Sequence, residues 1–127
     1  MLTDTQRALF QGTNFAHLAT VMPDGSPHVS PVWIEMDGDD ILVNTAEGRV
    51  KTNNMRRDPR VAISITDVND GYRMVAVRGR VVEMTHEGAE EGIDRLSRKY
   101  HGYDYDGRTP GMVRLSVRIR PEIVAEM

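Results

Sequence analysis

The sequence has no cysteine among its 127 residues, which excludes disulfide bonds, thiolate nucleophiles and zinc held by cysteine. Aromatic residues make up only 6% of the chain, so aliphatic and methionine side chains must fill most of its core. An apolar run of the ~20 residues that a membrane-spanning helix requires is also missing, and the N-terminus lacks a signal-peptide core. We therefore expect a protein that stays in the cytoplasm and does not enter a membrane.

Positive charge is not in excess either. The chain carries 16 Lys and Arg against 19 Asp and Glu, a formal net charge of -3. Nucleic-acid binding over a broad surface is not expected, because basic residues would act against an acidic background. A barrel that binds single-stranded nucleic acid would also need exposed aromatic side chains along a basic groove, and aromatic residues are few in this chain. The length and the 39% apolar content fit one domain with one core, residues 1–127.

Common catalytic and metal-binding motifs are missing. The sequence has no Gly-x-Gly-x-x-Gly or phosphate-loop pattern, and its four histidines lack the spacing of a metal site. We therefore predict no metal site and assign no catalytic side chain, which indicates that a bound cofactor supplies the chemistry. Three tyrosines qualify as proton donors by their chemistry alone: Tyr72, Tyr103 and Tyr105.

Alternating polarity and turn residues predict a mainly β fold of six to seven antiparallel strands with short flanking helices. Strands are expected at residues 15–22, 27–36, 41–45, 60–66, 72–84 and 112–120, and helices at residues 3–10, 48–58 and 87–100. Gly79 is expected at a bulge or barrel corner, and Pro121 at a strand end or on an edge. Arg114, Arg118 and Arg120 should share a wet or ligand-facing side of the last strand. Closure into a small barrel would remove the sheet edges, and a dimer would bury the outer surface.

The predicted helix at residues 48–58 places cations where its dipole does not favour them. Arg49 and Lys51 lie in the first turn, at the positive end, where acids are the favoured residues. A phosphate held by the first-turn amides and by both side chains would resolve the conflict. The alternative is a solvated basic helix whose charges pair with Glu47 and Asp58.

Two runs carry a family resemblance: residues 26–33 (SPHVSPVW), after a Pro-Asp-Gly turn, and residues 48–61 (GRVKTNNMRRDPRV). They resemble the pyridoxamine-phosphate-oxidase-like superfamily of split β-barrels, an FMN-binding type of fold, and in particular its branch that uses the deazaflavin coenzyme F420. The resemblance covers nearly the whole chain. It implies an oxidoreductase that transfers a hydride from reduced F420 to a small unsaturated or quinone-like acceptor, and a homodimer with two cofactor sites at the interface.

The same resemblance implies the residues of the cofactor site. Arg49 and Lys51 would hold the cofactor phosphate, and Asn54 would bond the chain that bears it. Residues 28–33 and 44–45 would form a wall for the ring, although Trp33 also suits packing and His28 a solvated position. Tyr72 and its neighbours would approach from the other subunit. The full expected set is His28, Ser30, Pro31, Val32, Trp33, Asn44, Thr45, Arg49, Val50, Lys51, Asn54, Arg57, Tyr72 and Met74.

The chain departs from the parent oxidase at its last strand. That enzyme carries Arg-x-His for the substrate phosphate, whereas residues 114–120 read RLSVRIR, so oxidation of vitamin B6 is not expected. An FMN-dependent oxidoreductase of the same fold and a non-catalytic carrier of flavin or deazaflavin stay open, because one phosphate site and one flat wall serve either cofactor. Arg56, Arg57 or Arg60 facing the site would favour F420, whose tail ends in carboxylates. The loop at residues 102–111 is a candidate lid.

Overall fold

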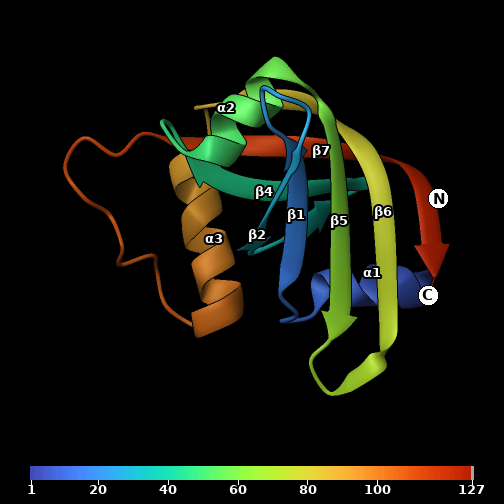
Figure 1. Ribbon diagram of the computed structural model, residues 1–127. Coiled ribbons are helices and arrows are strands. Elements are labelled where there is room, and N and C mark those ends of the chain that lie inside the picture. Colours follow the sequence, from blue (N-terminus) through green and yellow to red (C-terminus); the bar gives the residue numbers. More distant parts are fainter. Residues whose placement is uncertain (127) are drawn as a thin grey trace.

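Residues 1–126, which the computed structural model describes, form seven strands and three short helices (Figure 1). The strands are β1 (Ala16–Val21), β2 (Pro27–Val32), β3 (Glu35–Asp37), β4 (Asp40–Ala46), β5 (Arg60–Asp67), β6 (Asp70–Thr85) and β7 (Arg114–Glu126). The helices are α1 (Asp4–Gln11), α2 (Val50–Arg57) and α3 (Ala89–His101). None of these helices is long and apolar enough to span a membrane.

All the strands of the described range belong to one antiparallel sheet, in the order β2-β1-β5-β6-β7-β4-β3. The sheet curves around a single core, and its two edge strands, β2 and β3, are separated in the chain by residues 33–34 alone. It is therefore a barrel that stays open between β2 and the β3–β4 pair. Helices α1 and α2 lie at opposite ends of this barrel (Figure 1). The predicted split β-barrel is confirmed.

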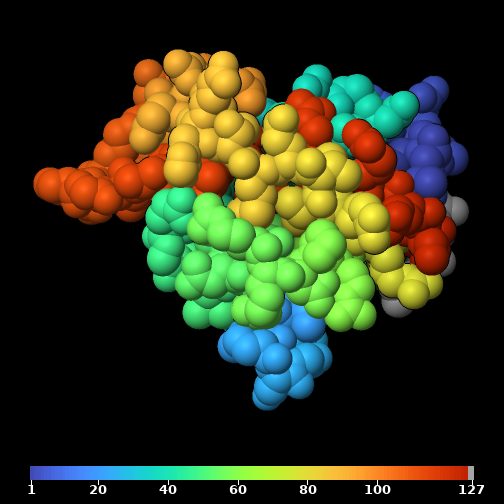
Figure 2. Space-filling view, turned by 90° about the horizontal axis from the view of Figure 1, so that it is seen from above, coloured from blue at the N-terminus to red at the C-terminus, as the bar shows by residue number. Residues whose placement is uncertain are grey.

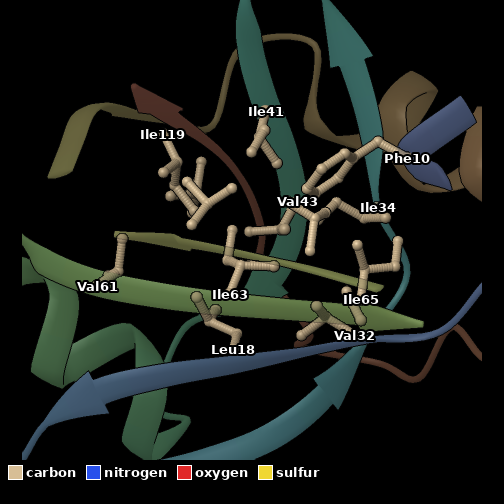
Figure 3. Packing of buried hydrophobic residues seen from close by; sticks show 14 of the residues in the cluster. Phe10, Leu18, Val32, Ile34, Ile41, Val43, Val61, Ile63, Ile65 and Ile119 are labelled. Carbon is tan, nitrogen blue, oxygen red and sulfur yellow. The ribbon is translucent and has the colours of Figure 1, made fainter. Parts of the chain in front are cut away.

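The core lies inside the sheet because alternate side chains of each strand point inward. On β5, Val61, Ile63 and Ile65 are buried, whereas Ser64 between them is exposed. Phe10 of α1 joins the same cluster of aliphatic side chains and is completely buried (Figure 3). Burial of each large apolar side chain stabilises the fold by about 1.5–3 kcal/mol. Because aromatic residues are few, most of this stabilisation comes from aliphatic side chains.

The strand predicted at residues 27–36 is instead two strands, because the chain leaves the sheet at Trp33 and Ile34. The amide of Ile34 donates to Tyr100 Oη (3.3 Å), and the carbonyl of Ile34 accepts a bond from Lys99 Nζ. Lys99 also donates to the carbonyl of Phe10 (2.7 Å). Burial lowers the pKa of Lys99 to about 8. Side chains of α3 thus replace the sheet partner of Ile34 and fix the chain where β2 ends.

Strand β7 continues through Pro121, so it does not end there, but its pairing with β4 stops at Ile119 and Pro121 lies on a locally unpaired edge, the other position that the sequence predicted. Pro121 pairs with Gly79 of β6 at a shift of register between Arg78 and Gly79, which places the missing amide at an irregularity of the ladder. The bulge expected at Gly79 is thereby confirmed. A Cβ atom on Gly79 would lie 2.3 Å from the carbonyl oxygen of Arg120, so only glycine fits this crossing.

We expect the substitution Gly79→Ala to lower the free energy of unfolding by about 1–3 kcal/mol, because the backbone of β7 must move to admit a methyl group. Urea denaturation followed by circular dichroism measures the change. Gly71→Ala is the matched control on the same strand, since nothing lies within 4 Å of its Cβ position. Equal stability of the two variants would contradict the close approach at Gly79.

Candidate functional site

A cavity of about 260 Å³ lies where the end of β2, strand β4 and the start of α2 meet α3. It combines an apolar wall with three cationic side chains. The lining residues are Phe15, Pro31, Val32, Trp33, Asn44, Arg49, Lys51, Ile93, Leu96, Tyr105 and Arg114. The cavity thus brings together six of the residues expected from the sequence: Pro31, Val32, Trp33, Asn44, Arg49 and Lys51.

The positive end of α2 has no neutralising group of its own. Its N-cap residue, Arg49, makes no capping bond through its side chain, and the first turn contains no acid. The other two helices differ: α1 has Thr3 as a cap and Asp4 in its first turn, and α3 has Glu90 and Glu91. The first amides of α2 lack carbonyl partners within the helix, so this end is suited to an anion.

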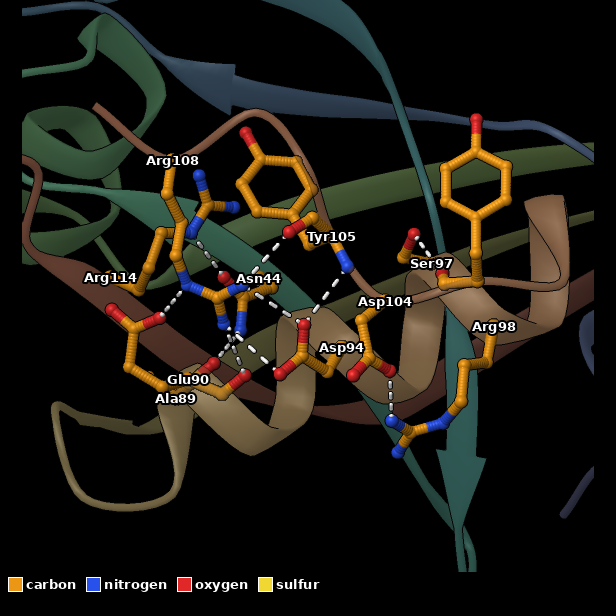
Figure 4. A network of polar contacts seen from close by, with 11 residues as sticks. Asn44, Ala89, Glu90, Asp94, Ser97, Arg98, Asp104, Tyr105, Arg108 and Arg114 are labelled. Carbon is orange, nitrogen blue, oxygen red and sulfur yellow. Dashed lines mark hydrogen bonds and ion pairs between the residues drawn. The ribbon is translucent and has the colours of Figure 1, made fainter.

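Three cations, Arg49, Lys51 and Arg114, line the cavity together and are called the cation cluster below. Arg114 projects from the start of β7, is only 5% exposed, and donates through Nε to Asn44 Oδ1 (2.8 Å; Figure 4). Lys51 Nζ lies 3.5 Å from Ser30 Oγ. Within residues 1–126 no carboxylate forms an ion pair with any member of the cluster.

The electrostatics of the cluster oppose its charged state. Burial lowers the pKa of Lys51, and the charges of Arg49 and Arg114 lower it further. Burial likewise lowers the pKa of Arg114, although the nearby Tyr105 acts in the opposite direction. A bound anion would reverse both effects, because an opposite charge at close range favours the charged form.

The acids near α2 pair with other arginines, so the alternative of helix charges paired with Glu47 and Asp58 holds for Arg56 but not for Arg49 and Lys51. Glu47 accepts two bonds from Arg56 (2.7 and 3.0 Å) and one contact from His86, and these partners lower its pKa to about 2. Asp58 binds Arg60 instead, and its pKa is also lowered to about 2. The cation cluster is therefore left without compensation by the fold.

The apolar wall of the cavity is anchored by Trp33. Its ring stacks on Tyr100 (centroids 5.5 Å apart, planes at 11°) and meets the ring of Tyr105 edge-on at 6.4 Å. Phe15 also packs on Tyr100, with ring centroids 5.4 Å apart. Trp33 is therefore packed against neighbouring aromatic rings, which fits the packing role. It also faces the cavity, where a wall for a ring was expected.

Two expected residues of β2 lie near the cation cluster without lining the cavity. Ser30 contacts Lys51, and His28 lies on the same inward face of the strand. The Nδ1 atom of His28 is buried and has no hydrogen-bond partner within the described residues. A buried polar atom without a partner is costly, so this atom is available to a ligand or to water.

Other expected residues have partners inside the fold. Thr45 is buried and shares a 2.9 Å hydrogen bond with Thr52. Asn54 is buried and donates to Thr20 Oγ1 (3.0 Å), which ties α2 to β1. Arg57 donates to Asn54 Oδ1 (3.0 Å) and to the carbonyl of Val21. None of these three side chains lines the cavity.

The remaining expected residues lie at the surface or far along β6. Val50 is 46% exposed at the start of α2. Tyr72 is 91% exposed and Met74 is half-buried, and both follow the β5–β6 turn, which lies at the opposite end of the barrel from α2 (Figure 1). They can approach a cavity of this kind only from a second subunit.

Sequence reasoning missed part of the lining. Arg114 was expected on a ligand-facing side of its strand, but nothing in the sequence distinguished it from Arg118 and Arg120. The structure pairs those two with Asp37 and Asp40, which leaves Arg114 alone without an acid among the three. The other lining residues outside the expected cofactor site are Phe15, Ile93, Leu96 and Tyr105, of which only Tyr105 had been named, as a proton donor by its chemistry.

Comparison with known proteins identifies the family. A sequence model described as pyridoxamine 5'-phosphate oxidase matches residues 2–126. The chain belongs to this family. Its members are oxidoreductases and bind flavins, which supports an enzymatic role for the chain at this level.

Solved structures of the family type resemble the whole chain. An F420 reductase is 27% identical, with a TM-score of 0.90 over 99% of this chain and 100% of its own. A conserved hypothetical protein from Mycobacterium tuberculosis is 26% identical, with a TM-score of 0.74 over 98% of this chain and 83% of its own. General Stress Protein 26 from Bacillus anthracis, 17% identical with a TM-score of 0.72 over 95% and 89%, shares the fold.

The side chains at the cavity suit a phosphate-bearing cofactor of the kind that the family binds. The cation cluster offers charged donors without an acid, and the amides of α2 add neutral donors beside it. Trp33, Pro31 and Val32 offer a flat apolar surface to a ring system. Both halves of such a ligand therefore find a matching surface.

We expect Lys51→Met to raise the free energy of unfolding at neutral pH in phosphate-free buffer. The pKa of Lys51 lies below its ordinary value of 10.5 in the folded protein, so the folded environment disfavours this charge. Between the folded value and 10.5 the unfolded state binds more protons, so wild-type stability rises with pH there and the advantage of the variant shrinks. Urea denaturation of both proteins across this pH range measures the difference in their stability. A variant less stable than the wild type at pH 7 would show that the fold does not disfavour the charge of Lys51.

Proposed function

We propose that this protein is a reductase that uses reduced F420 and passes a hydride to a small unsaturated or quinone-like acceptor. The observation that carries the proposal is the cation cluster, which meets the start of α2 beside an apolar ring-sized wall. The resemblance of the whole chain to an F420 reductase supports the choice of cofactor.

In this proposal the start of α2 binds the phosphate of the cofactor. Arg49 contributes a planar fork of donors and Lys51 a compact charge, and the free amides of the first turn complete the set. Arg114 adds a third charge from β7, held in direction by Asn44. Since no acid competes for these groups, the binding energy is not reduced by breaking an ion pair.

The wall around Trp33 orients the ring and keeps water from one of its faces. A reduced deazaflavin supplies a hydride from its central ring, so the protein needs only to expose the other face to the acceptor. Tyr100 fixes Trp33 by stacking, and it is itself held by the bond from its hydroxyl to the carbonyl of Asn14 (2.6 Å). We assign no general acid and take the proton of the product from solvent.

An FMN-dependent oxidoreductase and a non-catalytic carrier are the alternatives. The arginines that would favour F420 by facing its acidic tail are held by partners in the fold: Arg56 by Glu47, Arg57 by Asn54, and Arg60 by Asp58. The preference for F420 therefore rests on the similarity to an F420 reductase. It does not rest on arginines that face the acidic tail of the cofactor. FMN shares the phosphate and the flat ring that the cavity suits.

We further propose that the protein acts as a homodimer through the outer face of strands β2, β1, β5 and β6. The registers place a patch of small or uncharged side chains on this face, His17, Ala19, Ala62, Ser64 and Ala76, and the exposed Arg78 borders the patch beside Ala62. Val29, beside Ala19, is 63% exposed. Covering this face with a second copy would bury it and let Tyr72 and Met74 approach the cavity of the other subunit.

The test is a titration of the purified protein with F420 and with FMN, read by quenching of Trp33, the one tryptophan. Lys51→Ala is expected to weaken F420 binding by about 1.5–3 kcal/mol, the range for a charge-assisted hydrogen bond. Arg7→Ala is the control, because Arg7 binds Asp39 and the carbonyl of Gly38 and does not line the cavity. It should leave the affinity unchanged.

Turnover then separates the alternatives. The protein loaded with reduced F420 is mixed with menadione, and oxidation of the cofactor is followed by absorbance. Tight binding of F420 without turnover would favour a carrier, and a response to FMN alone would favour the FMN enzyme. Equal affinity of wild type and Lys51→Ala for F420 would remove Lys51 from the phosphate site.

A further inference from the structure

One segment of the cavity lining lies outside the barrel. The α3–β7 loop, residues 102–113, joins the end of α3 to the start of β7 and contributes Tyr105 to the lining. Its residues 102–112 belong to no strand, and Figure 2 shows the loop as the orange segment that stands out from the body at the left. Its conformation therefore depends on side-chain bonds to α3.

Arg108 supplies the largest share of those bonds. It donates to Glu90 Oε2 (2.9 Å), to both oxygens of Asp94 (3.1 Å each) and to the carbonyl of Tyr105 (2.9 Å), as Figure 4 shows. The amide of Tyr105 donates to the same carboxylate, at Asp94 Oδ1 (2.9 Å). Arg108 and the backbone of Tyr105 are thus fixed to one turn of α3.

The ring of Tyr105 is held as closely as its backbone. The guanidinium carbons of Arg108 and Arg114 lie 5.7 and 5.3 Å from its centre, and its edge meets Trp33. Gly107 lies against the hydroxyl end, because a Cβ atom on Gly107 would be 2.6 Å from Tyr105 Oη. Little room is left for another position of the ring while Arg108 is in place.

We propose that Tyr105 limits the size of the electron acceptor that the cavity admits, and that Arg108 is a positioning residue that acts through Tyr105. The inference rests on the proposed reductase function, since it concerns the acceptor of that reaction. It adds Tyr105 as a residue that determines specificity, and Arg108, outside the cavity, as the residue that holds Tyr105 in position.

The bonds of Arg108 are strong enough to hold this arrangement. Asp94 is ionised at neutral pH, because the bond from Arg108 and that from the amide of Tyr105 both lower its pKa. Its bonds to Arg108 are therefore charge-assisted, about twice as strong as neutral ones. Loss of Arg108 leaves Asp94 with the Tyr105 amide alone and frees one face of the ring.

Arg98 provides a matched control on the same helix and loop. It forms an exposed ion pair with Asp104, the residue next to Tyr105, at 2.5 Å. No bond or ring contact joins Arg98 to Tyr105 within the described residues. Arg98→Ala removes a cation and a loop contact of similar exposure, and it leaves the position of Tyr105 unchanged in this account.

Gly107→Ala supplies an independent route to the same displacement. It keeps Arg108 and its bonds, but its new methyl group occupies the space of the Tyr105 hydroxyl. Two chemically unrelated changes, Arg108→Ala and Gly107→Ala, should therefore produce the same change at the cavity. Both effects should vanish in a Tyr105→Ala background. If Arg108 and Gly107 act only through the ring of Tyr105, changing them has no further effect once that ring has been removed.

The experiment compares wild type with Arg108→Ala, Gly107→Ala, Arg98→Ala and the Tyr105→Ala combinations. Accessibility of Trp33 to acrylamide is measured first, without any ligand. Binding and turnover of 1,4-benzoquinone, menadione and 9,10-phenanthrenequinone, with one, two and three rings, follow in the presence of F420. The chain has no cysteine that a quinone could alkylate.

We expect Arg108→Ala and Gly107→Ala to expose Trp33 and to improve the affinity for phenanthrenequinone relative to benzoquinone by roughly 5- to 10-fold, a normal range for discrimination by pocket size. The dissociation constant of F420 should change less than about twofold, because both variants keep the cation cluster, with Arg114 bound to Asn44, and keep Trp33 stacked on Tyr100. Arg98→Ala should match the wild type in all three measurements.

An unchanged Trp33 in both variants, or an unchanged ratio between the quinones, would overturn the role of Arg108. Equal effects of Arg98→Ala and Arg108→Ala would show a loop held by its overall charge, which also contradicts the proposal. Failure of the reductase function gives a different result: no quinone is reduced by any variant, while the acrylamide measurement still reports whether Arg108 positions Tyr105.

Discussion

Uncompensated positive charge at the start of α2 is the constraint on which the site depends. A helix of this kind gains from acids in its first turn, yet Arg49 is its N-cap residue, Lys51 lies in that turn, and Arg114 joins them from β7. The nearby acids bind other arginines, so the fold does not resolve the repulsion. An anionic ligand is the simplest partner for such a group, and members of the family bind flavins.

The rest of the structure holds that charged corner against a rigid apolar wall. The chain turns at Trp33 and Ile34 because Lys99 and Tyr100 of α3 take the place of a sheet partner. The same turn aims Trp33 at the cavity and stacks it on Tyr100. α3 thus has two roles, since it ends β2 and also carries the apolar residues Ile93 and Leu96 that close the cavity. The cations and the apolar wall of the cavity thus come from largely separate elements.

Local patterns in the sequence predicted what depends on neighbours in the chain. Alternating polarity and turn residues located the strands, and the mismatch between charge and dipole singled out Arg49 and Lys51. The break after Val32 was not predictable, because its cause lies about 65 residues away in Lys99 and Tyr100. Asn54 suited a ligand contact in the sequence, whereas its partner Thr20 appears only when α2 packs on β1. The role of Arg114 in the cavity was not predictable either, because it became distinct only once Arg118 and Arg120 were seen to pair with Asp37 and Asp40.

A crystal structure of the protein with oxidised F420 bound would show directly which groups bind the cofactor. We predict the phosphate of the cofactor within hydrogen-bond distance of Arg49, Lys51 and the first amides of α2, with the ring against Trp33. A phosphate bound elsewhere, with these two side chains directed into solvent, would contradict the central claim, and the similarity to an F420 reductase would not restore it.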